Sequence, residues 1–143
     1  MERRIGKKTA WAAACGLGLL LLAGCGPSSD RQALEGTVTL DGAPLAEGSI
    51  TLRPLPGTRG PPAGGKISEG KFSVSPEEGT FAGTFRVEIT ASRKTGRQVT
   101  DQFGNPVDEM AQYIPTKYNR QSELTVEIKA DTPNKLKFDL ASQ

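Results

Sequence analysis

The chain has no histidine among its 143 residues, and this limits the chemistry that its side chains can perform. A Ser-His-Asp triad, a Cys-His nucleophile pair and a zinc site with histidine ligands are all excluded. Two carboxylates could still act together as acid and base, but most acidic residues alternate onto the polar faces of the expected strands. We therefore expect that the protein is not an enzyme, and we expect no cofactor.

Cys25 is the residue to which the sequence assigns the most definite chemistry. It follows Leu22, Ala23 and Gly24, at the end of an uncharged, mostly apolar run over residues 9–23. The eight residues before that run carry four basic side chains and one acidic side chain. This order of a basic segment, an apolar segment and small residues is typical of a secretion signal. A membrane-spanning helix needs about 20 apolar residues, and this run is shorter and interrupted by glycines.

The sequence Leu22-Ala23-Gly24-Cys25 resembles the lipobox of bacterial lipoproteins, in which the cysteine thiol receives a diacylglyceryl group. The resemblance implies cleavage before Cys25 and a further acyl chain, such as palmitate, on the amine that cleavage frees. We therefore predict a signal peptide over residues 1–24 and a lipidated tether over residues 25–33. The alternative is a retained signal anchor, in which Cys25 has no role.

This anchor would place the protein on the exported side of the cell membrane or outer membrane, with the membrane as a partner. Residue 26 is glycine and not aspartate, so an inner-membrane retention signal of the Asp-after-Cys kind is absent. In a host that uses this rule, we expect the protein at the outer membrane.

The mature chain that cleavage would leave is close to neutral. Residues 1–24 contain four of the 18 Lys and Arg and one of the 16 Asp and Glu, which leaves 14 basic and 15 acidic residues. Nucleic-acid binding needs a strong basic excess on one face, so we expect no nucleic-acid partner. Cys15 would leave with the signal peptide, so the mature chain would have no disulfide and its stability must come from packing.

Residues 34–141 show the alternation of apolar and polar residues that is typical of β-strands. The clearest alternating segments are 34–40, 50–53, 65–68, 71–74, 83–90, 124–129 and 135–140. Their inward faces would hold 17 large apolar side chains: Leu34, Val38, Leu40, Ile50, Leu52, Ile67, Phe72, Val74, Phe85, Val87, Ile89, Leu124, Val126, Ile128, Leu136, Phe138 and Leu140. Asp41-Gly42 and Glu69-Gly70 are expected turns. The pattern predicts an all-β fold, a single monomeric antiparallel β-sandwich of about seven strands.

Residues 93–122 interrupt this pattern and are expected to form a long loop, with a helical turn over residues 108–113. Loops of this length are usually functional or disordered. Oxygen ligands for Ca²⁺ are present, although their spacing is not that of an EF-hand and a solvated loop is the plainer interpretation. These four candidate ligands are Asp101, Asn105, Asp108 and Glu109.

The same loop contains two further candidate binding sites. Tyr113 and Tyr118 could stack on a sugar or a peptide, or could instead seal an edge of the sandwich. Arg93 and Lys94, with Arg97, could contact anionic lipid or polysaccharide, or could form a solvated basic turn.

Several motifs resemble those of carboxypeptidase regulatory-like domains, which belong to the transthyretin-like (prealbumin-like) sandwiches. Residues 36–45 (GTVTLDGAPL) and 48–52 (GSITL) are similar to the opening of these domains, and residues 83–87 (GTFRV) resemble their later Gly-x-Tyr-x-Val strand. Residues 113–119 (YIPTKYN) resemble a motif of small envelope lipoproteins that carry this domain. The resemblance covers roughly residues 34–140. It implies a fold and a location, and the enzymatic relatives of this fold rely on histidines that this chain lacks.

These observations predict a lipid-anchored, non-catalytic module of the cell envelope with a structural or protein-interaction role. The alternative is a module that binds envelope glycans or peptides through residues 93–122. Only the alternative assigns the function to a particular segment, the one that the strand pattern does not explain.

Overall fold

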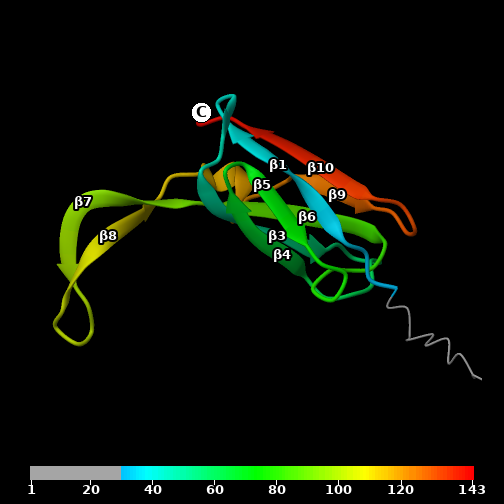
Figure 1. The fold of residues 1–143 in the computed structure, drawn as a ribbon, viewed down its shortest axis with the longest axis horizontal. Helices are drawn as coiled ribbons and strands as arrows, with labels where there is room; N and C mark the ends of the chain where they lie inside the picture. Colours follow the sequence, from blue (N-terminus) through cyan, green and yellow to red (C-terminus); the bar gives the residue numbers. More distant parts are fainter. Residues whose placement is uncertain (1–29) are drawn as a thin grey trace, which may run out of the picture.

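The computed structural model describes residues 30–143, so the expected signal peptide and Cys25 lie outside the described residues. The described chain is all-β, with ten strands and one short 3-10 helix (Figure 1). The elements are β1 (Leu34–Leu40), β2 (Ala43–Pro44), β3 (Glu47–Pro54), β4 (Ala63–Ser68), β5 (Lys71–Val74), β6 (Gly83–Thr90), β7 (Ser92–Thr100), β8 (Pro106–Gln112), η1 (Thr116–Tyr118), β9 (Thr125–Ile128) and β10 (Asn134–Leu140). Within residues 30–143, no helix is long and apolar enough to cross a membrane.

Eight strands form one curled sheet, in which seven follow the order β10-β1-β5-β4-β3-β6-β9 and β2 pairs with β1. All neighbouring strands are antiparallel except β1 and β10, which run parallel from Leu34 opposite Asn134 to Leu40 opposite Leu140. The expectation of a purely antiparallel sheet was therefore wrong at this pair. Alternation reveals which face of a strand is buried, but it carries no information about the direction of a partner distant in sequence.

Two short turns connect strands as the sequence predicts. Asp41 and Gly42 have φ values of 51° and 81°, and Glu69 and Gly70 have φ values of 50° and 75°. Positive φ at both central residues is the geometry that matches the twist of a two-residue hairpin. The hairpin expected over residues 65–74 is confirmed as β4 and β5.

The curl of the sheet encloses a single cluster of buried apolar side chains. Of the 17 predicted core residues, 13 are buried, and four lie partly buried against the cluster: Leu40, Leu124, Val126 and Leu136. Leu45, Ala63, Ala91 and Ile114 are also buried and were not among those 17 residues. Ile114 is the notable addition, because it lies in the segment that was expected to be a loop.

Most of that segment is instead a second, two-stranded sheet formed by β7 and β8. The helical turn expected over residues 108–113 is wrong, because β8 extends through Gln112. We call residues 92–112 the arm. Figure 1 shows the arm projecting from the curled sheet, at the end opposite to the blue segment with which the described chain begins. All nine residues of β7 are exposed, so the arm has no core-facing side and lacks the apolar alternation that reveals other strands.

Candidate functional site

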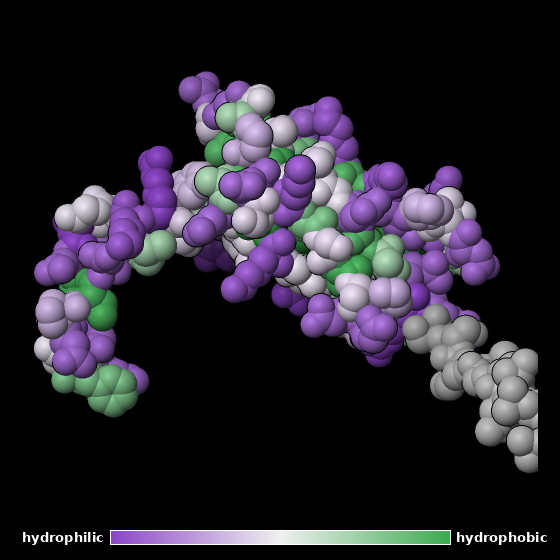
Figure 2. Space-filling model, in the orientation of Figure 1, coloured by the Kyte–Doolittle hydropathy of each residue, from purple (hydrophilic) through white to green (hydrophobic). Residues whose placement is uncertain are grey.

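The arm carries all the large hydrophobic side chains that are exposed in the described part of the chain. Their exposed fractions are 44% for Val99, 79% for Phe103, 39% for Val107 and 55% for Met110. Val99 and Val107 lie directly opposite each other in the β7–β8 ladder, and Phe103 lies at the tip. Figure 2 shows these green side chains on the arm among hydrophilic ones. Grouped exposed hydrophobic residues mark interaction sites more often than single scattered ones do.

Asp101 organises the tip that presents Phe103. Its Oδ1 accepts hydrogen bonds from the backbone N–H groups of Phe103 (2.8 Å) and Asn105 (2.9 Å). The N–H of Asp101 donates to the carbonyl oxygen of Asn105 (2.9 Å), and Gly104 takes the left-handed φ of 85° that closes the turn. The phenyl ring is therefore exposed on a hydrogen-bonded turn.

The same backbone donors affect the ionisation of this carboxyl group. They hold the pKa of Asp101 below its ordinary value, with the hydrogen bond from the Asn105 backbone as the largest cause. Because the pKa is lowered in the folded chain, the carboxylate supports the turn above the unfolded pKa of about 3.9 and is lost only as pH falls through the lowered value. The tip therefore keeps its geometry at neutral pH.

Ion pairs line the two faces of the arm. Lys94 Nζ lies 2.5 Å from Asp108 Oδ2, and Arg97 Nε lies 2.9 Å from Glu109 Oε2. The hydrogen bond from Lys94 to Asp108 raises the pKa of the lysine. Exposed pairs of this kind contribute little to stability, and an isolated two-stranded hairpin is only marginally stable in water. The arm is therefore a surface element that depends on its base, or on a partner, for order.

These contacts also show how the calcium-ligand candidates lie. Asp101 and Asn105 hold the tip together, whereas Asp108 and Glu109 are successive residues of β8 and point to opposite faces of the arm. Among residues 30–143, no group of three or more acidic or thiol side chains is placed to hold a metal ion. The structure does not bring the four candidates together.

The base of the arm is fastened to the curled sheet by Gln112. Its Oε1 accepts hydrogen bonds from the N–H groups of Ala91 (3.1 Å) and Ile114 (3.0 Å), the residues on either side of the arm. Tyr113 N–H donates to the carbonyl oxygen of Ala91 (3.1 Å), and Ile114 enters the core. Gln112 was not among the expected site residues, because one glutamine in a polar segment gives no signal in a sequence.

Three of the predicted binding residues meet at this base. Arg93, Lys94 and Tyr113 line an open hollow of about 570 Å³ together with Met110. The guanidinium carbon of Arg93 lies 5.2 Å from the centre of the Tyr113 ring, in cation–π contact. One face of this tyrosine is therefore already occupied by the arginine.

Tyr118 does not line this hollow at the base of the arm. Its hydroxyl accepts a hydrogen bond from the N–H of Ala141 (3.1 Å), and Lys117 Nζ lies 5.1 Å from the centre of its ring. The two tyrosines therefore serve different parts of the fold, and no common stacking site is formed.

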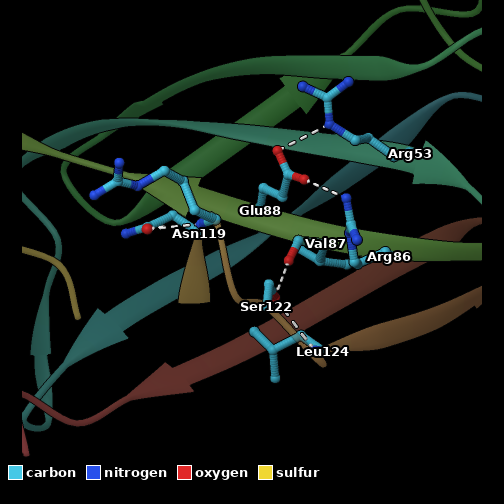
Figure 3. A network of polar contacts seen from close by, with 8 residues as sticks. Arg53, Arg86, Val87, Glu88, Asn119, Ser122 and Leu124 are labelled. Atoms are coloured by element: carbon cyan, nitrogen blue, oxygen red, sulfur yellow. Dashed lines mark hydrogen bonds and ion pairs between the residues drawn. The ribbon is translucent and has the colours of Figure 1, made fainter. Parts of the chain in front are cut away.

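The connection from η1 back to the sheet is fixed by two buried polar residues, Asn119 and Ser122 (Figure 3). Asn119 Nδ2 donates to the carbonyl oxygens of Ile114 and Pro115, both at 3.1 Å. Ser122 Oγ donates to the carbonyl oxygen of Val87. Buried polar groups are costly unless they are paired, so these bonds define one path for the chain beside the arm. The YIPTKYN motif thus has a structural role at the base of the arm.

A carboxylate on the outer face of β6 is held between two arginines, as Figure 3 also shows. Glu88 lies 2.9 Å from both Arg53 Nε and Arg86 Nη2. The hydrogen bond from Arg53, followed by that from Arg86, holds the pKa of Glu88 below its ordinary value. A carboxyl group that stays ionised at neutral pH is not suited to donate a proton as a general acid.

Comparison with known proteins identifies no family for this chain. No protein-family model matches it, and no curated protein matches it. Among solved structures, it is similar to part of a 9R-lipoxygenase from Cyanothece PCC8801, with 15% sequence identity and a TM-score of 0.33. The match covers 94% of this chain and 18% of the lipoxygenase chain. A likeness this weak carries no argument about fold or activity.

Proposed function

We propose that this protein is a lipid-anchored, non-catalytic module of the bacterial cell envelope, and that its arm binds a protein partner. The lipobox-like sequence ending at Cys25 supports the anchor, and the motifs over residues 36–52 support a transthyretin-like sandwich for the curled sheet. The observation that carries the proposed interaction is the gathering of the exposed hydrophobic side chains on the arm.

The chemistry of the arm indicates what kind of partner it suits. In the described sheets, β7 and β8 pair only with each other, so each has an outer edge outside any ladder. An added strand can pair with such an edge through main-chain hydrogen bonds. An exposed aromatic ring such as Phe103 typically anchors an interface by entering an apolar pocket. We therefore infer a protein partner that offers an edge strand and an apolar pocket.

The position of the arm suits this role in a tethered protein. The described chain begins at the end of the domain opposite to the arm (Figure 1). A tether over residues 25–33 would reach at most about 30 Å at 3.3–3.6 Å per residue. A lipid on Cys25 would thus hold one end of the domain near the bilayer and leave the arm at the other end.

Binding of glycans or peptides through the tyrosines has weaker support. Arg93 covers one face of Tyr113, and the hydroxyl of Tyr118 is bonded to the C-terminal segment. Sugar-binding sites usually present free aromatic faces, whereas the free ring on this arm is that of Phe103.

Thiol protection in native membranes tests whether the arm is covered. Gln102→Cys places a thiol next to Phe103, and Thr125→Cys places a matched thiol at an exposed position of β9. We expect a maleimide to react with the residue-102 thiol about tenfold more slowly in native membranes than in purified protein, because the partner covers the tip.

Two comparisons make this test specific. The thiol at position 125 is expected to react equally in both preparations, and adding Phe103→Ser to the Gln102→Cys chain is expected to remove the protection. Equal reaction rates at position 102 in membranes and in purified protein would refute a covered arm.

A further inference from the structure

The outer face of β10, β1, β5 and β4 contains an open hollow of about 700 Å³ that is bordered by four lysines. Lys135 and Lys137 lie on β10, Lys71 on β5 and Lys66 on β4. We call this site the lysine hollow. Its place in the sheet is set by register, because Thr37 of β1 lies opposite both Lys137 and Lys71. Neighbouring strands are about 4.8 Å apart, so cations from β10, β5 and β4 lie over one surface that spans four neighbouring strands.

The lysine hollow has a local excess of positive charge, although residues 25–143 as a whole are close to neutral. Lys135 Nζ lies 3.4 Å from Glu35 and Lys137 Nζ lies 2.9 Å from Asp139. Lys66 and Lys71 make no ion pair with any residue in 30–143. Four lysines against two carboxylates give a local charge of +2, whereas residues 25–143 with 14 basic and 15 acidic side chains have a net charge of −1.

The lining of the lysine hollow is not purely polar. Its floor is the middle of the sheet at Gly36, Phe72 and Leu136. These positions alternate with those of the lysines, so the side chains of Phe72 and Leu136 pack on the core face of the sheet. A Cβ on Gly36 would lie 2.8 Å from the Phe72 ring, so glycine is needed for this close packing. Lysine side chains add apolar stems below their charged ends. Ammonium groups carried on apolar stems match a group that is anionic at one end and apolar at the other.

The position at which the expected tether joins the domain indicates where an anionic group with an apolar end would come from. Residues 35–37 and 135–137 lie in the first halves of β1 and β10, and β1 begins four residues after Asp30. The expected tether therefore leads directly into a strand that lines the lysine hollow. With the lipid anchor proposed above, this site lies within about 30 Å of a bilayer.

We propose that the lysine hollow binds the phosphate headgroups of anionic phospholipids in the membrane to which the protein is anchored. The ammonium groups of Lys66 and Lys71 pair with phosphodiester oxygens, and the apolar lysine stems contact the glycerol end of the headgroup. The proposal rests on the lipid anchor of the proposed function, and it adds a second contact that orients the domain on the bilayer.

Vesicle co-sedimentation tests this proposal without the lipid anchor. The sample is the mature chain, residues 25–143 with Cys25→Ser, which retains all the buried apolar residues of the described core. We expect it to bind vesicles of phosphatidylglycerol and phosphatidylcholine, to bind pure phosphatidylcholine far more weakly, and to dissociate at high salt. Lys66→Gln with Lys71→Gln is expected to weaken the binding about tenfold.

A matched control separates a site from general charge attraction. Lys117→Gln with Arg120→Gln removes the same charge from exposed positions near η1, and is expected to leave the binding unchanged. No binding to the anionic vesicles, or an equal loss in both double variants, would overturn the proposal. Neither result would bear on the lipid anchor. Lipid attachment is measured separately, by fatty-acid labelling at Cys25 in the full chain.

Discussion

Cys25→Ser is expected to abolish fatty-acid labelling of the protein and to move it from the membrane fraction to the soluble fraction. Serine keeps the size of the side chain but lacks the thiol that accepts the diacylglyceryl group. Each buried CH₂ of an acyl chain contributes about 0.8 kcal/mol, so several chains give lasting attachment that one protein surface does not. Metabolic labelling with palmitate and fractionation after a high-salt wash measure both effects, and the salt removes weak electrostatic attachment through the lysine hollow.

The control for this experiment is the other cysteine of the sequence. Cys15 lies inside the expected signal peptide, so Cys15→Ser is expected to leave labelling and localisation unchanged. Labelling that persists in Cys25→Ser would contradict lipid attachment at this residue. Circular dichroism of the released Cys25→Ser protein is expected to match that of the wild type, because the described core lies entirely beyond the tether.

The second large effect is expected from a comparison of two phenylalanines. Phe85 of β6 is fully buried with 0% exposed, whereas Phe103 at the tip of the arm is 79% exposed. Phe85→Ala removes a ring from the centre of the core and is expected to lower the free energy of unfolding by about 3–5 kcal/mol. Phe103→Ala is expected to change it by less than about 0.5 kcal/mol, because no core contact is lost. Urea denaturation of the mature chain measures both values.

This pair of variants separates a structural role of the arm from an interaction role. If Phe103→Ala lowered the free energy of unfolding by as much as Phe85→Ala, the ring would be part of the core in solution and unavailable to a partner. A small effect of Phe103→Ala on the free energy of unfolding would mean that the exposed ring does not stabilise the fold. Contact with a partner would then explain why a large apolar side chain is exposed at this position.

The strands with one buried face were predictable from the sequence because alternation is a direct consequence of their environment. Segments 34–40, 71–74 and 83–90 match the observed β1, β5 and β6 in their bounds. The turns at Asp41-Gly42 and Glu69-Gly70 were predictable for a similar reason, since glycine readily takes the positive φ that these turns require. In each of these cases, the types of residues that are adjacent in the sequence were sufficient to predict the local structure.

The arm was not predictable in the same way. β7 is exposed along its whole length, so burial selects no alternating pattern in residues 92–100. Its pairing with β8 is supported by cross-strand contacts such as Lys94 with Asp108, and ion pairs of this kind cannot be recognised before the register is known. The sequence did identify residues 93–122 as exceptional, but their form depends on tertiary contacts at Gln112 and Ile114.

The arrangement of the candidate binding residues was also predictable only in part. Arg93, Lys94 and Tyr113 do come together, because they lie at the base of one hairpin. Tyr118 lies elsewhere, because η1 directs it toward the C-terminal segment. The most exposed of these hydrophobic side chains, Phe103, was not among the candidate binding residues, since a single aromatic residue in a polar segment does not reveal whether it faces a core or the solvent.

Photo-crosslinking from position 103 in living cells tests the central proposal most directly. A benzophenone-bearing phenylalanine in place of Phe103 keeps an aromatic ring at the tip and reacts with whatever lies against it. The account predicts one discrete adduct with a protein, lost when Val99→Ser and Val107→Ser remove the apolar face of the arm, and absent when the crosslinker is placed at the exposed Thr125. No adduct at position 103, or an adduct with lipid or glycan alone, would contradict the proposal that the arm binds a protein.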